Sequence, residues 1–166
     1  MSEDSNQPGQ VRRVDDGVEG RIERVYAHGP AALWRMLTDP QAMAQWLAPG
    51  TIDLRAGGAV RIDFADSGTL IDSTVLAIDA QRLLEYSWSS GSEPARPLRW
   101  ELNPVAGGTQ LVLTVRIPVG EDASKAVAGF DAHLDMLAGA LEGVPIKFPF
   151  QRYLDARKHY QQMLAG

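Results

Sequence analysis

The sequence contains no cysteine. Disulfide bonds, thiolate metal sites and cysteine nucleophiles are therefore excluded. The sequence also lacks an excess of basic residues, because 16 lysines and arginines face 21 aspartates and glutamates, which gives a formal net charge of −5. Phosphate binding draws on clustered Lys and Arg, so this balance argues against a general partner among nucleic acids or anionic membranes.

Long apolar runs and strong catalytic motifs are missing too. No stretch is long enough to span a bilayer, and the opening residues, MSEDSNQPGQVRR, have no apolar signal-peptide core. We therefore expect a cytoplasmic protein. A nucleophile elbow (G-x-S-x-G), a phosphate-binding loop and a zinc motif (H-E-x-x-H) are all absent. No pair among the three histidines has metal-ligand spacing, so we expect neither a metal nor a cofactor.

What is present is enough apolar sequence for one domain with a core, since 45% of the 166 residues are hydrophobic. Residues 1–16 are polar, which predicts a disordered N-terminal tail. Residues 17–143 carry the periodic patterns of a folded domain. Residues 144–166 form a C-terminal extension, in which a helix from about residue 150 to residue 164 is expected to pack on the domain or on a second subunit.

The periodic patterns predict an α+β fold. A first strand over residues 18–27 precedes two short helices that begin near Pro30 and Pro40. Alternating segments then predict further strands over 59–64, 68–79, 82–89, 98–103 and 109–118. Their short connections are typical of an antiparallel meander, of about six or seven strands in all. A long amphipathic helix from Ala123 to Leu141 has one apolar side, and it is expected to lie across the curved sheet.

Several segments together resemble a known family. They are ALWRMLTDPQAMAQWLAPG at 32–50, LRAGGAVRIDF at 54–64, LAIDAQRLLEYSW at 76–88, RWELNPVAGGTQLVLTVRIP at 99–118 and GFDAHLDMLAGALEG at 129–143. In this order they resemble the helix-grip superfamily of START-like (SRPBCC) domains. More narrowly, they resemble homologues of the C-terminal domain of the activator of the heat-shock-protein-90 ATPase. The resemblance covers residues 18–143 and implies a helix-grip fold, with a cavity between sheet and long helix.

Aromatic and aliphatic residues occupy the elements that should frame this cavity. Each could merely fill the core, but ligand pockets are mainly apolar and aromatic. Trp88 and Trp100, on adjacent strands, are the foremost lining candidates. The full set of apolar candidates is Trp34, Trp46, Phe64, Tyr86, Trp88, Trp100, Phe130, Leu134 and Leu137.

Two polar residues complete the candidate site. His133 lies at the margin of the helix stripe, where it is either a boundary residue or a group at the cavity mouth that binds an anion or transfers a proton. Asp72 lies on a strand with apolar residues on both faces. We therefore expect either Asp72 or Thr74 to be partly enclosed, and an enclosed Asp72 carboxylate would need a cationic partner such as Arg99.

Three functions are compatible with these patterns. The first is binding of a hydrophobic or amphipathic small molecule between sheet and long helix. The second is a cyclase- or hydrolase-type enzyme that uses Asp72, Tyr86 or His133 as acid and base. The third, which rests on the family resemblance alone, is a co-chaperone-like activator of a heat-shock-protein ATPase. We rank them in this order, and a homodimer formed through the C-terminal helix is compatible with all three.

Overall fold

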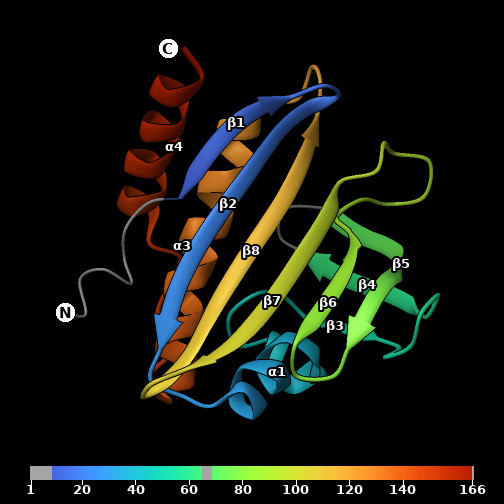
Figure 1. Cartoon of the computed structure of the whole chain (residues 1–166), viewed down its shortest axis with the longest axis vertical. Coiled ribbons are helices and arrows are strands. Elements are labelled where there is room, and N and C mark those ends of the chain that lie inside the picture. Colours follow the sequence, from blue (N-terminus) through green and yellow to red (C-terminus); the bar gives the residue numbers. More distant parts are fainter. Residues whose placement is uncertain (1–8, 65–68, 166) are drawn as a thin grey trace.

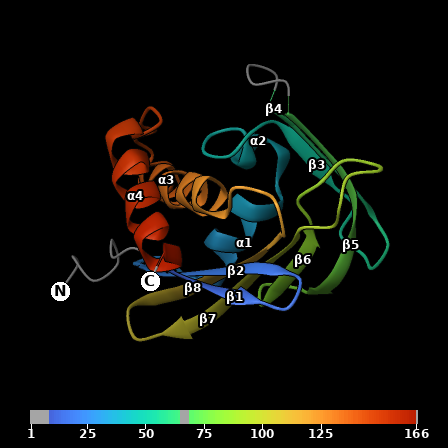
Figure 2. The same cartoon turned by 90° about the horizontal axis from the view of Figure 1, so that it is seen from above.

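An antiparallel sheet curves around one long helix in the computed structural model of the chain (Figures 1 and 2), which describes residues 9–64 and 69–165. Within those residues the sheet has eight strands in the order β1-β2-β8-β7-β6-β5-β4-β3. The strands are β1 (Gln10–Val14), β2 (Gly17–Tyr26), β3 (Gly50–Ile52), β4 (Ala59–Phe64), β5 (Thr69–Asp79), β6 (Leu83–Ser87), β7 (Pro97–Val105) and β8 (Gly108–Pro118). The helices are α1 (Pro30–Thr38), α2 (Pro40–Met43), α3 (Ala123–Leu141) and α4 (Phe150–Ala165).

The predicted α+β helix-grip fold is confirmed, but the expected count of six or seven strands was too low. One strand that the patterns missed is β1, which lies inside the tail predicted to be disordered. It pairs with β2, with Val11 opposite Gly20, and the Val11 side chain is buried. β1 is held in place by its contacts with β2 and α4, and the local composition of residues 10–14 does not reveal such contacts. The other missed strand, β3, has three residues, too few to show alternation. The remainder of the predicted tail, residues 1–8, lies outside the described residues.

The pairing of β2 with β8 brings two distant parts of the chain together beneath α3. The register runs over the whole of β2, from Gly17 opposite Pro118 to Tyr26 opposite Thr109. Gly20 permits close approach of the helix, because a Cβ atom at this position would lie 2.5 Å from the Val127 Cγ2 atom of α3. Asp122 caps the N-terminus of the helix, and its side chain accepts hydrogen bonds from the Lys125 backbone N–H and the Ser124 hydroxyl.

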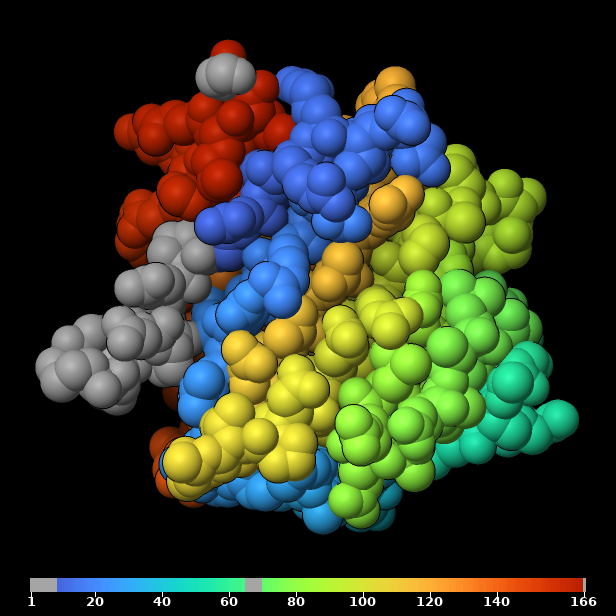
Figure 3. All heavy atoms as spheres, in the orientation of Figure 1, coloured from blue at the N-terminus to red at the C-terminus, as the bar shows by residue number. Residues whose placement is uncertain are grey.

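Helix α4 packs against α3 and β1, and the space-filling view shows it beside the N-terminal strand (Figure 3). A buried polar network underlies this contact. Arg24 of β2 forms an ion pair with Asp131 of α3, and the Tyr160 hydroxyl of α4 donates a hydrogen bond to the same carboxylate. The Gly9 backbone N–H donates to the Tyr160 oxygen at 2.7 Å. Burial raises the pKa of Asp131, while its bonds to Tyr160 and Arg24 oppose that rise.

No helix in the described part of the chain is both long enough and apolar enough to cross a membrane.

Candidate functional site

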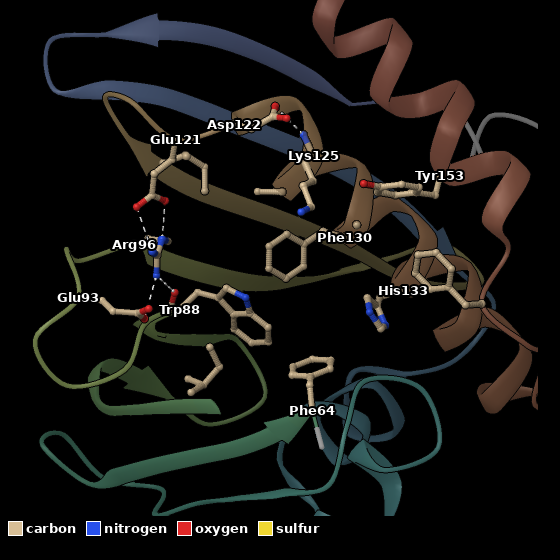
Figure 4. Close-up of a pocket in the computed structure, with 15 residues that line it drawn as sticks. Phe64, Trp88, Glu93, Arg96, Glu121, Asp122, Lys125, Phe130, His133 and Tyr153 are labelled. Carbon is tan, nitrogen blue, oxygen red and sulfur yellow. Dashed lines mark hydrogen bonds and ion pairs between the residues drawn. The ribbon is translucent and has the colours of Figure 1, made fainter. Parts of the chain in front are cut away.

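A pocket of about 780 Å³ lies between α3 and the concave face of the sheet, and it is open to solvent (Figure 4). Its lining comes from β4, β5, the β6–β7 connection, the end of β8 and the connection after it, α3, and the start of α4 with the segment before it. Its apolar lining residues are Phe64, Ile71, Trp88, Ile117, Phe130, Phe148 and Tyr153. Its polar lining residues are Glu93, Arg96, Glu121, Asp122, Lys125 and His133.

An aromatic wall forms one side of the pocket. The Trp88 ring meets Phe130 edge to face at a centroid distance of 5.2 Å and Phe64 at 5.7 Å. His133 continues the wall, with its ring 5.9 Å from Phe64 and 5.6 Å from Phe148. Such edge-to-face contacts hold the rings in place. Because Trp88 is only partly buried, part of its surface is available to a ligand.

His133 presents a hydrogen-bond acceptor to this pocket. Its Nδ1 atom lies 2.9 Å from the Trp46 carbonyl oxygen. Since a carbonyl only accepts hydrogen bonds, Nδ1 must carry the proton, which leaves the Nε2 lone pair free in the neutral ring. Burial lowers the pKa of His133, opposed by the bond to Trp46, so the ring is neutral at pH 7. Among the described residues, Nε2 has no hydrogen-bond partner.

Arg96 fixes the end of the pocket nearest the β6–β7 connection. Its Nε and Nη2 atoms donate to the two Glu121 carboxylate oxygens at 2.7 and 3.0 Å, and Nη1 donates to the Trp88 carbonyl at 3.0 Å. The two-point contact with Glu121 raises the pKa of Arg96. With Glu93 also within 3.4 Å, the Arg96 charge is compensated by two carboxylates, and its bond to the Trp88 carbonyl holds the backbone of that residue.

Lys125 differs from Arg96 because its side-chain ammonium has no ion-pair partner among the described residues. The neighbouring carboxylate of Asp122 is already bound by Arg157, with an N–O distance of 2.7 Å. Figure 4 shows the Lys125 side chain extending toward Phe130. The pocket therefore has, beside its aromatic wall, one ammonium group that forms no ion pair with a described residue.

The structure brings four of the predicted site residues together at the pocket: Phe64, Trp88, Phe130 and His133. The remaining apolar candidates do not line it. Trp34 of α1 is partly buried against the core, and the fully buried ones are Trp46, Tyr86, Trp100, Leu134 and Leu137.

These residues are buried because α1, α2 and the segment after them fill the space under α3 that the pocket does not occupy. Trp46, which follows α2, meets Trp100 edge to face at 5.8 Å. The Trp46 indole N–H donates to the Met36 carbonyl at 2.8 Å, and the Trp100 N–H donates to the Tyr86 hydroxyl at 3.3 Å. These tryptophans are therefore core residues with satisfied polar atoms. The prediction that Trp100 lines the cavity beside Trp88 was wrong.

The expected environment of Asp72 was also wrong. Its side chain is 41% exposed and pairs with Arg61 at 3.5 Å, because β4 and β5 pair with these two residues opposite each other. Arg99, the expected partner, pairs instead with Glu85 at 3.1 Å. The neighbour Ile71 faces the pocket, and alternation along β5 turns Asp72 away. Of the three residues considered as acid and base, only His133 reaches the pocket.

Sequence reasoning missed the residues that loops and the C-terminal extension contribute. They are Glu93, Arg96, Glu121, Phe148 and Tyr153. Connections carry no periodicity that would assign their side chains to a face. The α3 residues Lys125, Gly129 and His133 were detectable, however, because residues four apart lie on one helix face.

Comparisons with known proteins agree on fold and family. The model of the family described as activator of Hsp90 ATPase homolog 1-like protein matches residues 27–142. The crystal structure of CalU16 from Micromonospora echinospora is similar, with a TM-score of 0.78 and 19% identity over 95% of this chain and 96% of that one. The protein encoded by gene BPP1335 from Bordetella parapertussis has a TM-score of 0.72 and 27% identity, over 93% and 91% of the two chains.

A further similar structure is DynU16, described as a protein of the dynemicin biosynthetic locus. It has a TM-score of 0.70 and 28% identity, over 80% of this chain and 49% of its own length. No curated protein matches this chain significantly.

Proposed function

The chain belongs to the family of activator of Hsp90 ATPase homolog 1-like proteins, and we propose that it binds a hydrophobic or amphipathic small molecule in the pocket beneath α3. The observation that carries this proposal is the open pocket of about 780 Å³ with its aromatic wall. That volume lies within the range typical of small-molecule sites, which are mostly apolar with a few placed polar groups.

Two further observations support binding of a small molecule. The similarity to DynU16, which is described by its biosynthetic locus, favours a small-molecule ligand over a protein partner. The catalytic alternative that the sequence suggested loses support, because of its three acid–base candidates Asp72 and Tyr86 lie outside the pocket and only His133 lines it. General acid–base catalysis needs such groups within hydrogen-bond reach of the reacting atom.

Tryptophan fluorescence provides the test. Trp88 lines the pocket, whereas Trp34, Trp46 and Trp100 do not. Titration with fatty acids, sterols and flat polyaromatic compounds should change the emission for at least one class, and Trp88→Phe should remove most of that change. Trp34→Phe, which alters a partly buried ring outside the pocket, is the matched control and should retain it.

Calorimetry with the same compounds checks binding independently of fluorescence. An absence of heat and of any emission change for every class would overturn the proposal. Stimulation of an Hsp90 ATPase by the purified protein, in the absence of ligand binding, would favour the co-chaperone function instead.

A further inference from the structure

Three residues of α3 form a line along the helix side of the pocket. Lys125, Gly129 and His133 are spaced by four residues, so they lie on one face of the helix, and all three line the pocket. The helical rise places the Cα atoms of Lys125 and His133 about 12 Å apart. The line therefore has a cation at one end, an acceptor at the other, and no side chain between them.

Gly129 leaves this middle position empty. A Cβ atom added there would meet no heavy atom within 4 Å, so the space above it belongs to the pocket rather than to a packed neighbour. Glycine within a helix costs about 1 kcal/mol relative to alanine. At Gly20 and Gly139 an added Cβ atom would collide with a neighbour, so close packing requires glycine there. At Gly129 no such collision would occur, and packing therefore does not explain why the helix has glycine at this position.

The two ends of the line differ in chemistry. At His133, the Trp46 carbonyl holds the proton on Nδ1, so Nε2 accepts a hydrogen bond and cannot donate one. At Lys125, the ammonium forms no ion pair with a described residue, because the neighbouring carboxylates of Glu121 and Asp122 contact Arg96 and Arg157 instead. Between the ends, the partly buried Trp88 ring offers surface to a flat ligand, and the buried Phe130 packs edge to face against it.

We propose that the ligand is an aromatic hydroxy acid that lies over Gly129, donates its hydroxyl hydrogen to His133 Nε2 and places its anionic group near Lys125. This inference rests on the proposed small-molecule binding and specifies the chemistry of the ligand. The ligand then has a planar body of two or more fused rings, with the hydroxyl group and the anionic group at opposite ends.

Three simple naphthalene compounds test the hydroxyl contact and the anion contact separately. They are 6-hydroxy-2-naphthoic acid, 6-methoxy-2-naphthoic acid, which cannot donate the hydrogen bond, and 2-naphthol, which lacks the anion. The hydroxy acid should bind about three- to tenfold more tightly than the methoxy acid, the range expected for one hydrogen bond. It should also bind more tightly than 2-naphthol, and added salt should narrow that second difference.

Matched variants assign each preference to a residue. In His133→Asn the amide can still reach the Trp46 carbonyl, but no atom replaces Nε2, so the preference for hydroxyl over methoxy should disappear. In His133→Gln the longer amide reaches the Nε2 position and should preserve part of that preference. Lys125→Met removes the charge from an exposed position, and it should remove the preference for the acid over 2-naphthol.

Gly129→Leu tests the location of the ligand. The added side chain should project into the pocket and weaken all three probes at least tenfold, while Ala138→Leu, on an exposed part of α3 outside this pocket, should not. Equal binding of the three probes, weakened by Gly129→Leu, would overturn the hydroxy-acid inference and leave the proposed function intact. Binding that Gly129→Leu does not affect, or no binding of any probe or lipid class, would overturn both.

Discussion

Arg24 of β2 and Asp131 of α3 form an ion pair from which solvent is almost completely excluded, with side-chain exposures of 2% and 0%. Asp135 adds a second, half-buried contact to Arg24 at 3.1 Å. The pair joins the sheet to the long helix on the side of α3 away from the candidate pocket. Its surroundings make it a determinant of stability rather than of ligand recognition.

Asp131→Asn should destabilise the fold strongly. It leaves the buried Arg24 charge with only Asp135, and breaking a buried ion pair costs about 3–5 kcal/mol. Because Asp135 remains, we expect a loss near the lower end of this range, measured as the free energy of unfolding in urea. Asp79→Asn is the surface control, since Asp79 and Arg82 are both more than 60% exposed and 3.9 Å apart. A loss for Asp131→Asn no larger than for Asp79→Asn would contradict the assignment.

Tyr160→Phe should loosen α4 and the first strand together. The hydroxyl bonds both the Gly9 N–H and Asp131, so its removal leaves two buried polar groups without this partner and should cost about 2 kcal/mol. Hydrogen exchange should accelerate in α4 and in residues 10–14 before it accelerates in β7 and β8. Tyr86→Phe, which removes a hydroxyl elsewhere in the core, should leave exchange in α4 unchanged. Uniform acceleration in the Tyr160→Phe variant would argue against a local role.

Gly129→Ala should stabilise the protein by about 0.5–1 kcal/mol, because alanine is the better helix former and its methyl group meets open space. Gly20→Ala should have the opposite sign, since its Cβ atom would lie 2.5 Å from Val127 Cγ2. Overpacking of this kind costs about 1–3 kcal/mol. Melting temperatures of the two variants should move in opposite directions, and a destabilised Gly129→Ala would mean that the space above this residue is filled.

The burial of His133 should make stability depend on pH. Burial lowers its pKa below the ordinary value of 6.5, so between the two values the unfolded chain binds more protons than the folded chain. The free energy of unfolding should therefore fall as the pH drops from 6.5 toward the lowered pKa. Above about pH 7.5 the ring is neutral in both states, so His133 should no longer make the free energy of unfolding depend on pH. Comparing wild type with His133→Gln across this interval isolates the effect. NMR titration of the His133 ring with a midpoint above 6.5 would refute it.

The sequence predicted the parts of this molecule that repeat with a regular period. The bounds of β4 and α3 agree with the prediction to the residue, because alternation and the helical stripe mark them directly. The stripe residue Phe130 reaches the pocket for the same reason.

The prediction failed where contacts between distant parts of the chain decide what a side chain packs against. Periodicity states which face of a strand is buried, but not whether a ligand space or another side chain covers it. Trp100 lies on β7 and Trp88 directly follows the neighbouring strand β6, yet the two differ in this respect, since Trp46 packs on Trp100 and the pocket adjoins Trp88. Phe148 and Arg96 lie in connections, where only the folded chain assigns a direction.

The partnership of β2 and β8 also has a consequence for biosynthesis. The two strands are separated by more than eighty residues, yet β2 pairs with β8 along its whole length. At a synthesis rate of about 5–20 residues per second, β2 waits several seconds for the strand that satisfies its backbone. During that delay the hairpin with β1 satisfies one edge of β2, while the opposite edge, with which β8 later pairs, stays open. The β8-facing edge of β2 is thus the place where the nascent chain is most exposed to incorrect strand pairing until β8 has been synthesised.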